Sequence, residues 1–391
     1  MSRLNELIAE LCPDGVEYKA LGEVFEKRNG YTPSKSNSSY WEGGSIPWFR
    51  MEDIRANGTV LDDAIQHVTE AAVKKGGVFP ANSIIVATSA TIGAHALIKC
   101  DFLCNQRFTC LTLREEFSGL FDLGFLNHYF VVLDEYCLAN VNQGSFASVK
   151  MGAFNKFHIP VPPIEVQREV VRVLDEYTAA HDEMVEQLNE EAYLHEQQLS
   201  GVRNELLGNR LAELCPDGVE YRQVGKVVTI RNGSDHKHLG DGNIPVYGSG
   251  GIMRYADAAS YTEPSVLLPR KGSVGNVFYV EEPFWNVDTV FYTVIDTSIM
   301  DPKYFYHLMV HANLAQYSTS AARPSLTQKT LNRIRIPVPP IEVQREVVRI
   351  LDEYTAAHDV LLESIAEERQ LATEQLALVR NQLLSFPEKV A

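Results

Sequence analysis

The chain has 391 residues, 45% hydrophobic and 22% charged, which is typical of a two-domain globular protein with a buried core. Its formal net charge of −16, taken as a whole, argues against a nucleic-acid binder, because phosphate contacts need lysine and arginine. The chain has no signal-peptide pattern, no apolar run near the roughly 20 residues of a membrane helix and only six cysteines, so we expect a reduced, cytoplasmic protein with no membrane partner.

Residues 1–158 predict a mixed α+β domain. The β-rich runs SIIVAT (83–88) and FTCLTL (108–113) stand between glycine-rich turns and predict strands. The segment DLGFLNHYFVVLDEY (122–136) predicts a helix that follows them. We call this variable segment head 1.

The next segment, 159–208, predicts one long helix. It opens with IPVPPIEVQREVVRVLDEYTAAHD (159–182), whose proline pair stands where proline is tolerated at a helix start. No further proline or glycine interrupts it until Gly201, and a helix of about 44 residues would be roughly 65 Å long. Apolar residues at three- and four-residue steps predict a coiled-coil-like seam with a slip at its centre. The seam residues are Val170, Val173, Tyr177, Ala180 and Met184, then Leu199, Val202 and Leu206.

The rest of the chain repeats this plan. Residues 209–335 predict a second mixed domain, head 2, with strands SVLLPR (265–270) and VFYTVI (290–295) and a helix over 301–315. Residues 336–391 predict a second long helix and a tail. The stretch 336–359 differs from 159–182 at one position only, where Ile350 stands in place of Val173. The chain is therefore two copies of one unit, with constant helices and divergent heads.

The order of the repeat is circular. The sequence IAELCPDGVEY at 8–18 returns as LAELCPDGVEY at 211–221, an offset of 203, whereas the long helices repeat at an offset of 177. The first variable segment is therefore 26 residues longer than the second. Joining the chain end to end would recreate the junction between the first long helix and head 2. This predicts an internal two-fold pseudosymmetry with the two termini close together.

The near-identity of the two long helices exceeds what packing requires, because packing tolerates apolar swaps. Polar residues such as Gln167, Arg168, Glu169 and Arg172, which we interpret as exposed, are retained in the second copy as well. We hypothesise that both copies present the same surface to the same kind of partner. Most of the excess negative charge lies on the long helices and the tail, and each head is nearly neutral. The negative net charge of the chain therefore does not exclude a basic face on each head.

Two motifs imitate catalytic signatures. Pro13-Asp14 followed by Glu17 and Lys19 resembles a nuclease motif, but its two parts are too close together, and a Pro-Asp-Gly turn explains it better. The sequence VPPI at 161–164 lacks the asparagine or aspartate that a methyltransferase would use on a target amine, and it is duplicated before a helix. Neither motif predicts an active site.

Two further groups have ordinary explanations. Cys100, Cys104 and Cys110 lie in a β-rich stretch without paired histidines at ligand spacing, which favours plain thiols over a zinc site. The loops TSATIG (88–93) and RKGSVG (270–275) are too weak as motifs for a nucleotide site. They stand at corresponding places in the two heads and are rich in small hydrogen-bonding side chains.

With its two divergent heads, each followed by a near-identical helix that begins IPVPPIEVQRE, the chain resembles the specificity (S) subunit of type I restriction-modification enzymes. The likeness covers essentially the whole chain and includes the circular repeat and the stretch SKSNSSYWEGGSIPWFRMEDI (34–54). It implies an α+β fold of two target-recognition domains, 1–158 and 209–335, separated by two long antiparallel helices in 159–208 and 336–391.

The resemblance also implies a function. Each head would read one half of a split, asymmetric site on double-stranded DNA, and each repeated helix would set the spacing and dock one methyltransferase (M) subunit. Restriction (R) subunits would join the assembly. The chain itself would be non-catalytic and hold no cofactor, because S-adenosylmethionine and ATP would be bound by the partner subunits.

The candidate DNA-reading residues are loop side chains that can contact base edges or phosphates. Those in head 1 are Lys35, Ser36, Asn37, Tyr40, Arg50, Thr88, Ser89, Gln106, Arg107, Ser145 and Lys150. Those in head 2 are Arg231, Asn232, His236, Lys237, Tyr247, Arg270, Lys271, Ser273, Arg323, Ser325, Gln328 and Lys329. Candidate partner-binding residues are Gln167, Arg168, Arg172, Gln344, Arg345 and Arg349. Trp48 is expected to pack in the core, and no residue is predicted to bind a metal.

Two other functions remain open at this point. The first is a coiled-coil adaptor with two protein-binding heads, which would bind DNA neither alone nor with a methyltransferase. The second is a stand-alone enzyme such as a nuclease. The sequence disfavours it because no convincing set of catalytic residues is found. Because its net charge is unfavourable, the isolated chain is expected to bind DNA weakly.

Overall fold

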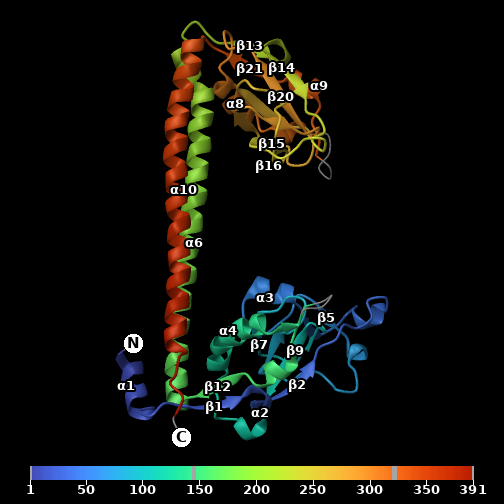
Figure 1. Cartoon of the computed structure of the whole chain (residues 1–391), viewed down its shortest axis with the longest axis vertical. Helices are drawn as coiled ribbons and strands as arrows, with labels where there is room; N and C mark the ends of the chain where they lie inside the picture. Colours follow the sequence, from blue (N-terminus) through green and yellow to red (C-terminus); the bar gives the residue numbers. More distant parts are fainter. Residues whose placement is uncertain (1, 143–146, 319–323, 390–391) are drawn as a thin grey trace. The chain divides into compact units, whose positions relative to one another are not determined.

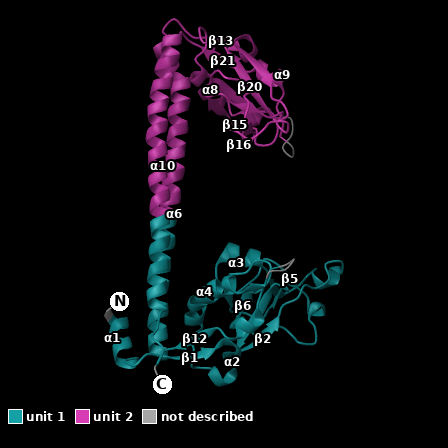
Figure 2. Cartoon of the chain, viewed as in Figure 1, with its two compact units in different colours: residues 1–185, 370–391 teal, residues 186–369 magenta. Residues whose placement is uncertain are grey.

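The computed structural model describes residues 2–142, 147–318 and 324–389. They form two compact units (Figure 2). Unit 1 contains Met1–Val185 and Gln370–Ala391, and unit 2 contains Glu186–Arg369. Each unit therefore consists of one head and a stretch of both long helices.

Head 1 is built from two sheets and a covering helix (Figure 1). The larger sheet has the strand order β2-β9-β6-β7-β4 and the smaller one the order β5-β3-β8, while β1 pairs with β12 and β10 with β11. The strands are β1 (Glu17–Ala20), β2 (Phe25–Asn29), β3 (Ile46–Phe49), β4 (Val60–Leu61), β5 (His67–Val68), β6 (Ser83–Ala87), β7 (His95–Ile98), β8 (Leu103–Cys104), β9 (Phe108–Leu113), β10 (Val141–Asn142), β11 (Ser148–Val149) and β12 (His158–Val161). The helices are α1 (Ser2–Leu11), α2 (Leu21–Val24), α3 (Met51–Asn57), α4 (Leu123–Ala139) and α5 (Met151–Asn155), with 3₁₀ turns at Ser38–Tyr40, Glu70–Ala72 and Glu115–Phe117.

Head 2 has the same skeleton. Its larger sheet has the order β14-β20-β17-β18 and its smaller one the order β16-β15-β19, and β13 pairs with β21 as β1 pairs with β12. The strands are β13 (Glu220–Gln223), β14 (Val228–Asn232), β15 (Ile244–Gly248), β16 (Gly251–Ala256), β17 (Ser265–Pro269), β18 (Phe278–Val280), β19 (Trp285–Asn286), β20 (Val290–Ile295) and β21 (Arg335–Val338). The helices are α7 (Asn209–Leu214), α8 (Pro302–His311) and α9 (Gln328–Arg333), with 3₁₀ turns at Val224–Lys226 and Leu314–Tyr317. The predicted common skeleton is confirmed, including all four predicted strands.

The central strands are buried on both faces, which explains their continuous apolar sequence. In β6, Ile84 and Val86 join a core that includes Phe130 of α4, whereas Ile85 and Ala87 join a second core between the two sheets. The second core contains Trp48, which is buried and donates a hydrogen bond from Nε1 to the carbonyl oxygen of Tyr31 at 3.0 Å. Its predicted role in packing is confirmed.

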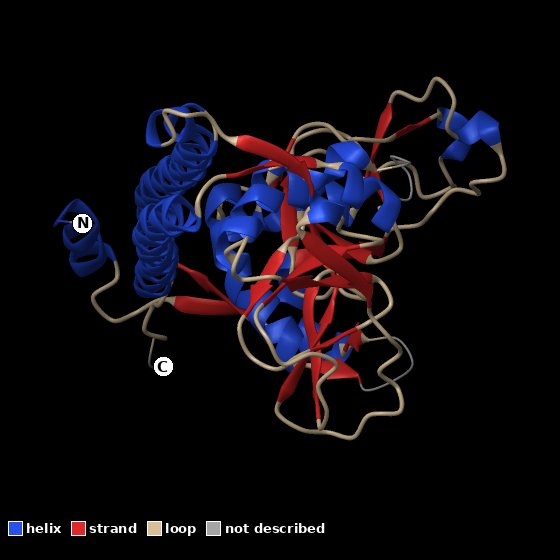
Figure 3. Ribbon diagram, turned by 90° about the horizontal axis from the view of Figure 1, so that it is seen from above, coloured by secondary structure: helices blue, strands red, loops and turns tan. Residues whose placement is uncertain are grey.

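The two long helices are α6 (Ile164–Leu207) and α10 (Ile341–Leu383). Their length agrees with the expected 44 residues or so, but they begin five residues after 159 and 336, because the first residues of each predicted segment form the strands β12 and β21. They run antiparallel within each unit. In unit 1 His181 contacts Thr373, and in unit 2 the Arg369 guanidinium donates to Asn189. Figure 3 shows that this part is entirely helical and that the strands belong to the heads.

The predicted seam is only partly correct. Val170 and Val173 are buried in the core of head 1, which also contains Leu383 at the end of α10. Tyr177 and Met184 are exposed, at 44% and 42%, because a two-helix contact buries only a narrow stripe of each helix. Other residues supply the buried positions along the middle of the helices, namely Leu188, Ile365 and Ala372.

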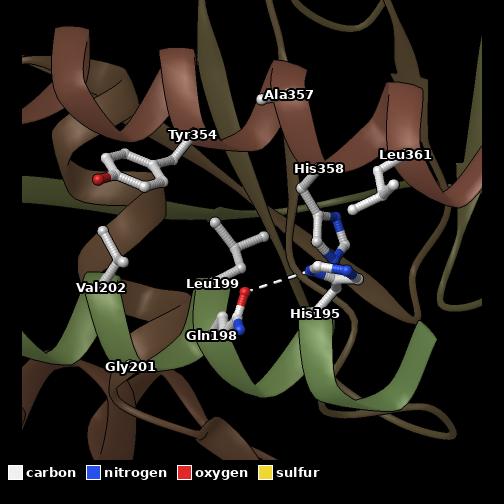
Figure 4. A pocket seen from close by; sticks show the side chains of 9 residues that line it. All are labelled: His195, Gln198, Leu199, Gly201, Val202, Tyr354, Ala357, His358 and Leu361. Carbon is white, nitrogen blue, oxygen red and sulfur yellow. Dashed lines mark hydrogen bonds between the residues drawn. The ribbon is translucent and has the colours of Figure 1, made fainter. Parts of the chain in front are cut away.

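A hollow of 420 Å³ opens between α6 and α10 in unit 2 (Figure 4). Leu199 and Val202 of α6 face Tyr354 and Leu361 of α10 across it, and Gly201 and Ala357 are too small to fill the space. The two helices are therefore loosely packed at this end of the predicted seam.

The chain termini meet in unit 1, as the circular repeat predicted. The Val16 N–H donates to the carbonyl oxygen of Pro387 at 2.9 Å, and the Lys389 N–H donates to the carbonyl oxygen of Val16 at 2.9 Å. The Tyr18 hydroxyl donates to the carbonyl oxygen of Phe386 at 2.8 Å. In unit 2 the equivalent connection is the continuous chain from α6 through α7.

Candidate nucleic-acid interface

In head 1, several loops meet at one edge of the larger sheet. Neighbouring antiparallel strands bring the end of β6 beside the start of β9. The N–H of Thr88, which follows β6, donates to the carbonyl oxygen of Arg107 at 3.0 Å. Ser89 forms a bridge with Ser148, and the Val149 N–H donates to the carbonyl oxygen of Thr88 at 2.9 Å. We call this edge the reading edge of head 1.

Hydroxyl and amide groups are linked along this edge. The Thr88 and Thr109 hydroxyls share a hydrogen bond of 2.8 Å, and the Thr109 hydroxyl donates to Oδ1 of Asn29 at 3.1 Å. The Thr32 hydroxyl donates to Oε1 of Gln106. Arg107 and Lys150 are exposed beside these groups. The edge thus combines two cations with side chains that can both donate and accept, the chemistry required to contact phosphates and base edges.

Head 2 has an equivalent reading edge. The N–H of Arg270, which follows β17, donates to the carbonyl oxygen of Thr289 at 2.8 Å, and the Leu326 N–H donates to the carbonyl oxygen of Arg270 at 2.9 Å. Lys271 forms a bridge with Ser325, as Ser89 does with Ser148. The loops 88–93 and 270–275 therefore occupy corresponding places, which confirms the prediction from their sequences.

The side chains at the second edge differ from those at the first. Nε2 of Gln328 donates to the Ile230 carbonyl oxygen at 3.3 Å and to Oδ1 of Asn232 at 3.4 Å. The Arg270 guanidinium lies 5.8 Å from the centre of the Phe291 ring, which helps to hold it at the edge. The remaining candidates on this edge and the loops beside it are exposed, namely Arg231, Lys271, Ser273 and Lys329.

A hollow of 620 Å³ adjoins the reading edge of head 2. The candidates His236 and Lys237 line it, and Nδ1 of His236 is buried there without a hydrogen-bond partner in the described chain. Sequence reasoning missed the other polar residues of its wall. These are Asp235, Ser249, Asp288 and Thr289, with Met253. No local motif marks them, because the wall is assembled from three separate segments of the chain.

Other candidates lie elsewhere in the heads. Lys35 lines a hollow of 210 Å³ with Trp41 and Gln66, and its neighbours Ser36, Asn37 and Tyr40 belong to the same loop. Arg50 precedes α3, 5.7 Å from the Trp48 ring centre. Tyr247 lines a different hollow, of 360 Å³, with Phe278 and Lys303. Ser145 and Arg323 lie outside the described residues.

The candidate partner-binding residues divide into two classes. Arg168, Arg172, Arg345 and Arg349 are exposed on the long helices. The hydrogen bonds that Arg172 donates to Glu169 and Glu176 raise the pKa of its guanidinium, and those that Arg349 donates to Glu346 and Glu353 do the same. Gln167 and Gln344, in contrast, are fully buried. The interpretation of Gln167 and Glu169 as exposed was wrong, since both face inward where α6 begins against head 1.

The motifs that imitate catalysis have structural explanations. Pro13 and Asp14 form a turn closed by the Gly15 N–H, which donates to the Cys12 carbonyl oxygen at 3.1 Å. Burial raises the pKa of the Cys104 thiol, as expected for a core residue. Over residues 2–142, 147–318 and 324–389, no three metal-ligating side chains gather, and no helix there is long and apolar enough to span a membrane.

Comparisons with known proteins agree with this arrangement. A family model described as a type I restriction modification DNA specificity domain matches residues 13–193 and 216–368. Over 388 residues the chain is 37% identical to the EcoprrI type I restriction enzyme specificity subunit of Escherichia coli, which covers 94% of this chain and 93% of that protein. It is 31% identical over 197 residues to the EcoR124I/EcoR124II specificity subunit of Escherichia coli, covering 48% of this chain and 47% of that one.

Two solved structures share the fold. One, from work on complex assembly and conformational transition of the type I restriction-modification system, has a TM-score of 0.67 at 17% identity and covers 95% of this chain and 98% of that chain. The other is an HsdS subunit from Thermoanaerobacter tengcongensis, with a TM-score of 0.51 at 18% identity and coverage of 96% and 97%.

Proposed function

The chain belongs to the specificity subunits of type I restriction-modification enzymes, and from this premise we propose that each of its heads reads one half of a split DNA sequence. The recognition domains would be residues 1–158 and 209–335, and the two half-sites would lie on one duplex. Because the heads differ, the whole site would be asymmetric.

The observation that carries this proposal is the difference between two equivalent reading edges. The same backbone bridge presents Thr88 and Ser89 in head 1 but Arg270 and Lys271 in head 2. Arginine and lysine favour the acceptors of guanine, while hydroxyls contact several bases. An identical skeleton with different side chains at the same place suits two readers of different sequences.

The long helices would join the heads to the rest of the enzyme. Residues 159–208 and 336–391 would set the unread gap between the half-sites, and each repeat would dock one methyltransferase subunit through exposed residues such as Arg168 and Arg345. Restriction subunits would complete the assembly. The chain would be a non-catalytic recognition subunit, with the methyl donor S-adenosylmethionine and ATP held by its partners.

The decisive experiment is to co-express the chain with its methyltransferase in a host without other modification enzymes and to map methylated bases over the genome. We expect one split asymmetric motif. Replacing 209–335 by the corresponding head of another specificity subunit should then change one half of the motif and leave the other. A methylome without any motif would support a protein-binding adaptor instead, and a change in both halves would contradict independent reading by the heads.

A further inference from the structure

The buried glutamine near the start of each long helix joins that helix to its own head. In unit 1, Nε2 of Gln167 donates to the carbonyl oxygen of Pro162 at 2.7 Å and to that of Leu120 at 2.9 Å. Its Oε1 accepts from the N–H of Asp122 at 2.8 Å. Pro162 precedes α6, whereas Leu120 and Asp122 belong to the turn that leads into α4. One side chain therefore ties the beginning of α6 to the beginning of α4.

The second copy repeats every one of these contacts. Nε2 of Gln344 donates to the carbonyl oxygens of Pro339 at 2.8 Å and Ile299 at 2.9 Å, and its Oε1 accepts from the N–H of Asp301 at 2.8 Å. Asp301 caps α8 as Asp122 caps α4, since each carboxylate accepts hydrogen bonds from the N–H groups of the second and third helical residues. We call each set of contacts a joint.

Only a carboxamide can make all three bonds at a joint. The site offers two backbone acceptors and one backbone donor, and glutamine supplies two N–H groups and one carbonyl oxygen in that pattern. A glutamate at this position would place a carboxylate oxygen, which can only accept, against two carbonyl oxygens, which also only accept. An apolar side chain would leave the three backbone groups without hydrogen-bond partners in the interior. Both glutamines are 0% exposed, so each carboxamide is buried away from water.

A second tie lies about two turns further along each long helix, and it differs between the copies. In unit 1, Nε2 of His128 on α4 lies 2.8 Å from Oδ1 of Asp175 on α6. In unit 2 the carboxylate of Asp352 instead accepts from Nζ of Lys303 on α8 at 2.9 Å, and Nε2 of His307 lies 3.7 Å from it. The glutamine joint is therefore the common element, and the second tie varies with the head.

We propose that Gln167 and Gln344 are positioning residues that fix the direction of each head against its long helix and so help to set the gap between the two half-sites. This inference depends on the proposed function. A head that could rotate at its joint would also bind half-sites separated by a slightly longer or shorter gap. This follows because a small rotation at the joint displaces the distant reading edge further than it displaces the residues of the joint. The retained glutamine in the repeated stretch is then explained without a docked partner.

The test uses the complex of the full chain with its methyltransferase. Methylation is measured on duplexes that carry both half-sites with the native gap or with one base pair more or fewer. Gln344→Met keeps the length of the side chain and removes its three hydrogen bonds. We expect the preference for the native gap to fall about tenfold, with the half-site sequences unchanged, since misplacement of about 1 Å can change rates by up to 10²-fold.

Controls separate the possible outcomes. Gln375→Met, at an exposed position of α10, should keep the native preference. An unchanged gap preference in a folded Gln344→Met complex would overturn the proposal, even if its melting temperature fell. If that variant does not fold, Gln344→Asn, which keeps the carboxamide but shortens it, provides the same comparison. A wild-type complex that methylates no split motif would refute the proposed function itself, which is a different result.

Discussion

The tail that closes unit 1 offers a quantitative test of the circular repeat. Phe386 is 93% buried, its relative exposure being 7%, and its ring centre lies 6.1 Å from that of Phe125. It belongs to the same core as Leu383 and Leu384 at the end of α10. The perturbation is Phe386→Ala, which removes the ring and keeps the backbone hydrogen bonds of the tail.

Truncating a buried phenylalanine to alanine costs about 3–5 kcal/mol. Because the tail is at the surface and can relax, we expect the lower end, about 3 kcal/mol in the free energy of unfolding of unit 1. Deleting 386–391 should cost about 1–3 kcal/mol more, since it also leaves the buried Val16 N–H without its partner. Unit 2 lacks this vulnerability because its equivalent connection is covalent.

Urea unfolding followed by tryptophan fluorescence gives the measurement. Trp285→Phe leaves Trp41 and Trp48 as the only tryptophans, and both report on unit 1. In that background, Phe386→Ala should shift the midpoint strongly, whereas Ser385→Ala, at an exposed neighbour, should not. A loss below about 1 kcal/mol for Phe386→Ala would refute the reasoning, because surface substitutions alone reach about half that value.

Three more outcomes are expected. Burial, and after it the Arg203 guanidinium, lowers the pKa of His307 to about 4 in the folded protein. The unfolded imidazole has a pKa near 6.5, so the unfolded state binds more protons between pH 4 and pH 6.5. The free energy of unfolding therefore decreases as the pH falls below 6.5. Free energies of unfolding from urea titrations at pH 7 and pH 5 should thus differ by roughly 2 kcal/mol in the wild type and much less in His307→Phe, and equal differences would contradict the assignment. Lys271→Ala should reduce by about one the slope of log affinity against log salt for DNA binding by the methyltransferase complex, while Lys99→Ala, near the opposite edge of the head 1 sheet, should leave it unchanged. Deleting seven residues from the middle of α6 should change the gap in the methylated motif or abolish assembly, and a normal motif would count against a spacing role.

The amino-acid sequence by itself determined the plan of the protein. The duplicated stretch predicted the two long helices, and the proline pairs located the starts of α6 and α10 to within a residue or two. The run SIIVAT predicted β6 because a strand buried on both faces must be apolar throughout. These features are local or repeated, so they can be recognised without knowing which segments meet.

Only the tertiary structure decided which residues share a site and which side chains face inward. Asp288 and Ser249 line the hollow beside His236 although no spacing in the chain connects them. Gln167 looked like an exposed polar residue on a helix, yet its partners Leu120 and Asp122 lie 47 and 45 positions away. Those partners are backbone groups, which every residue carries, so the sequence holds no sign of the contact. A buried amide differs from an exposed one only in what the fold places around it.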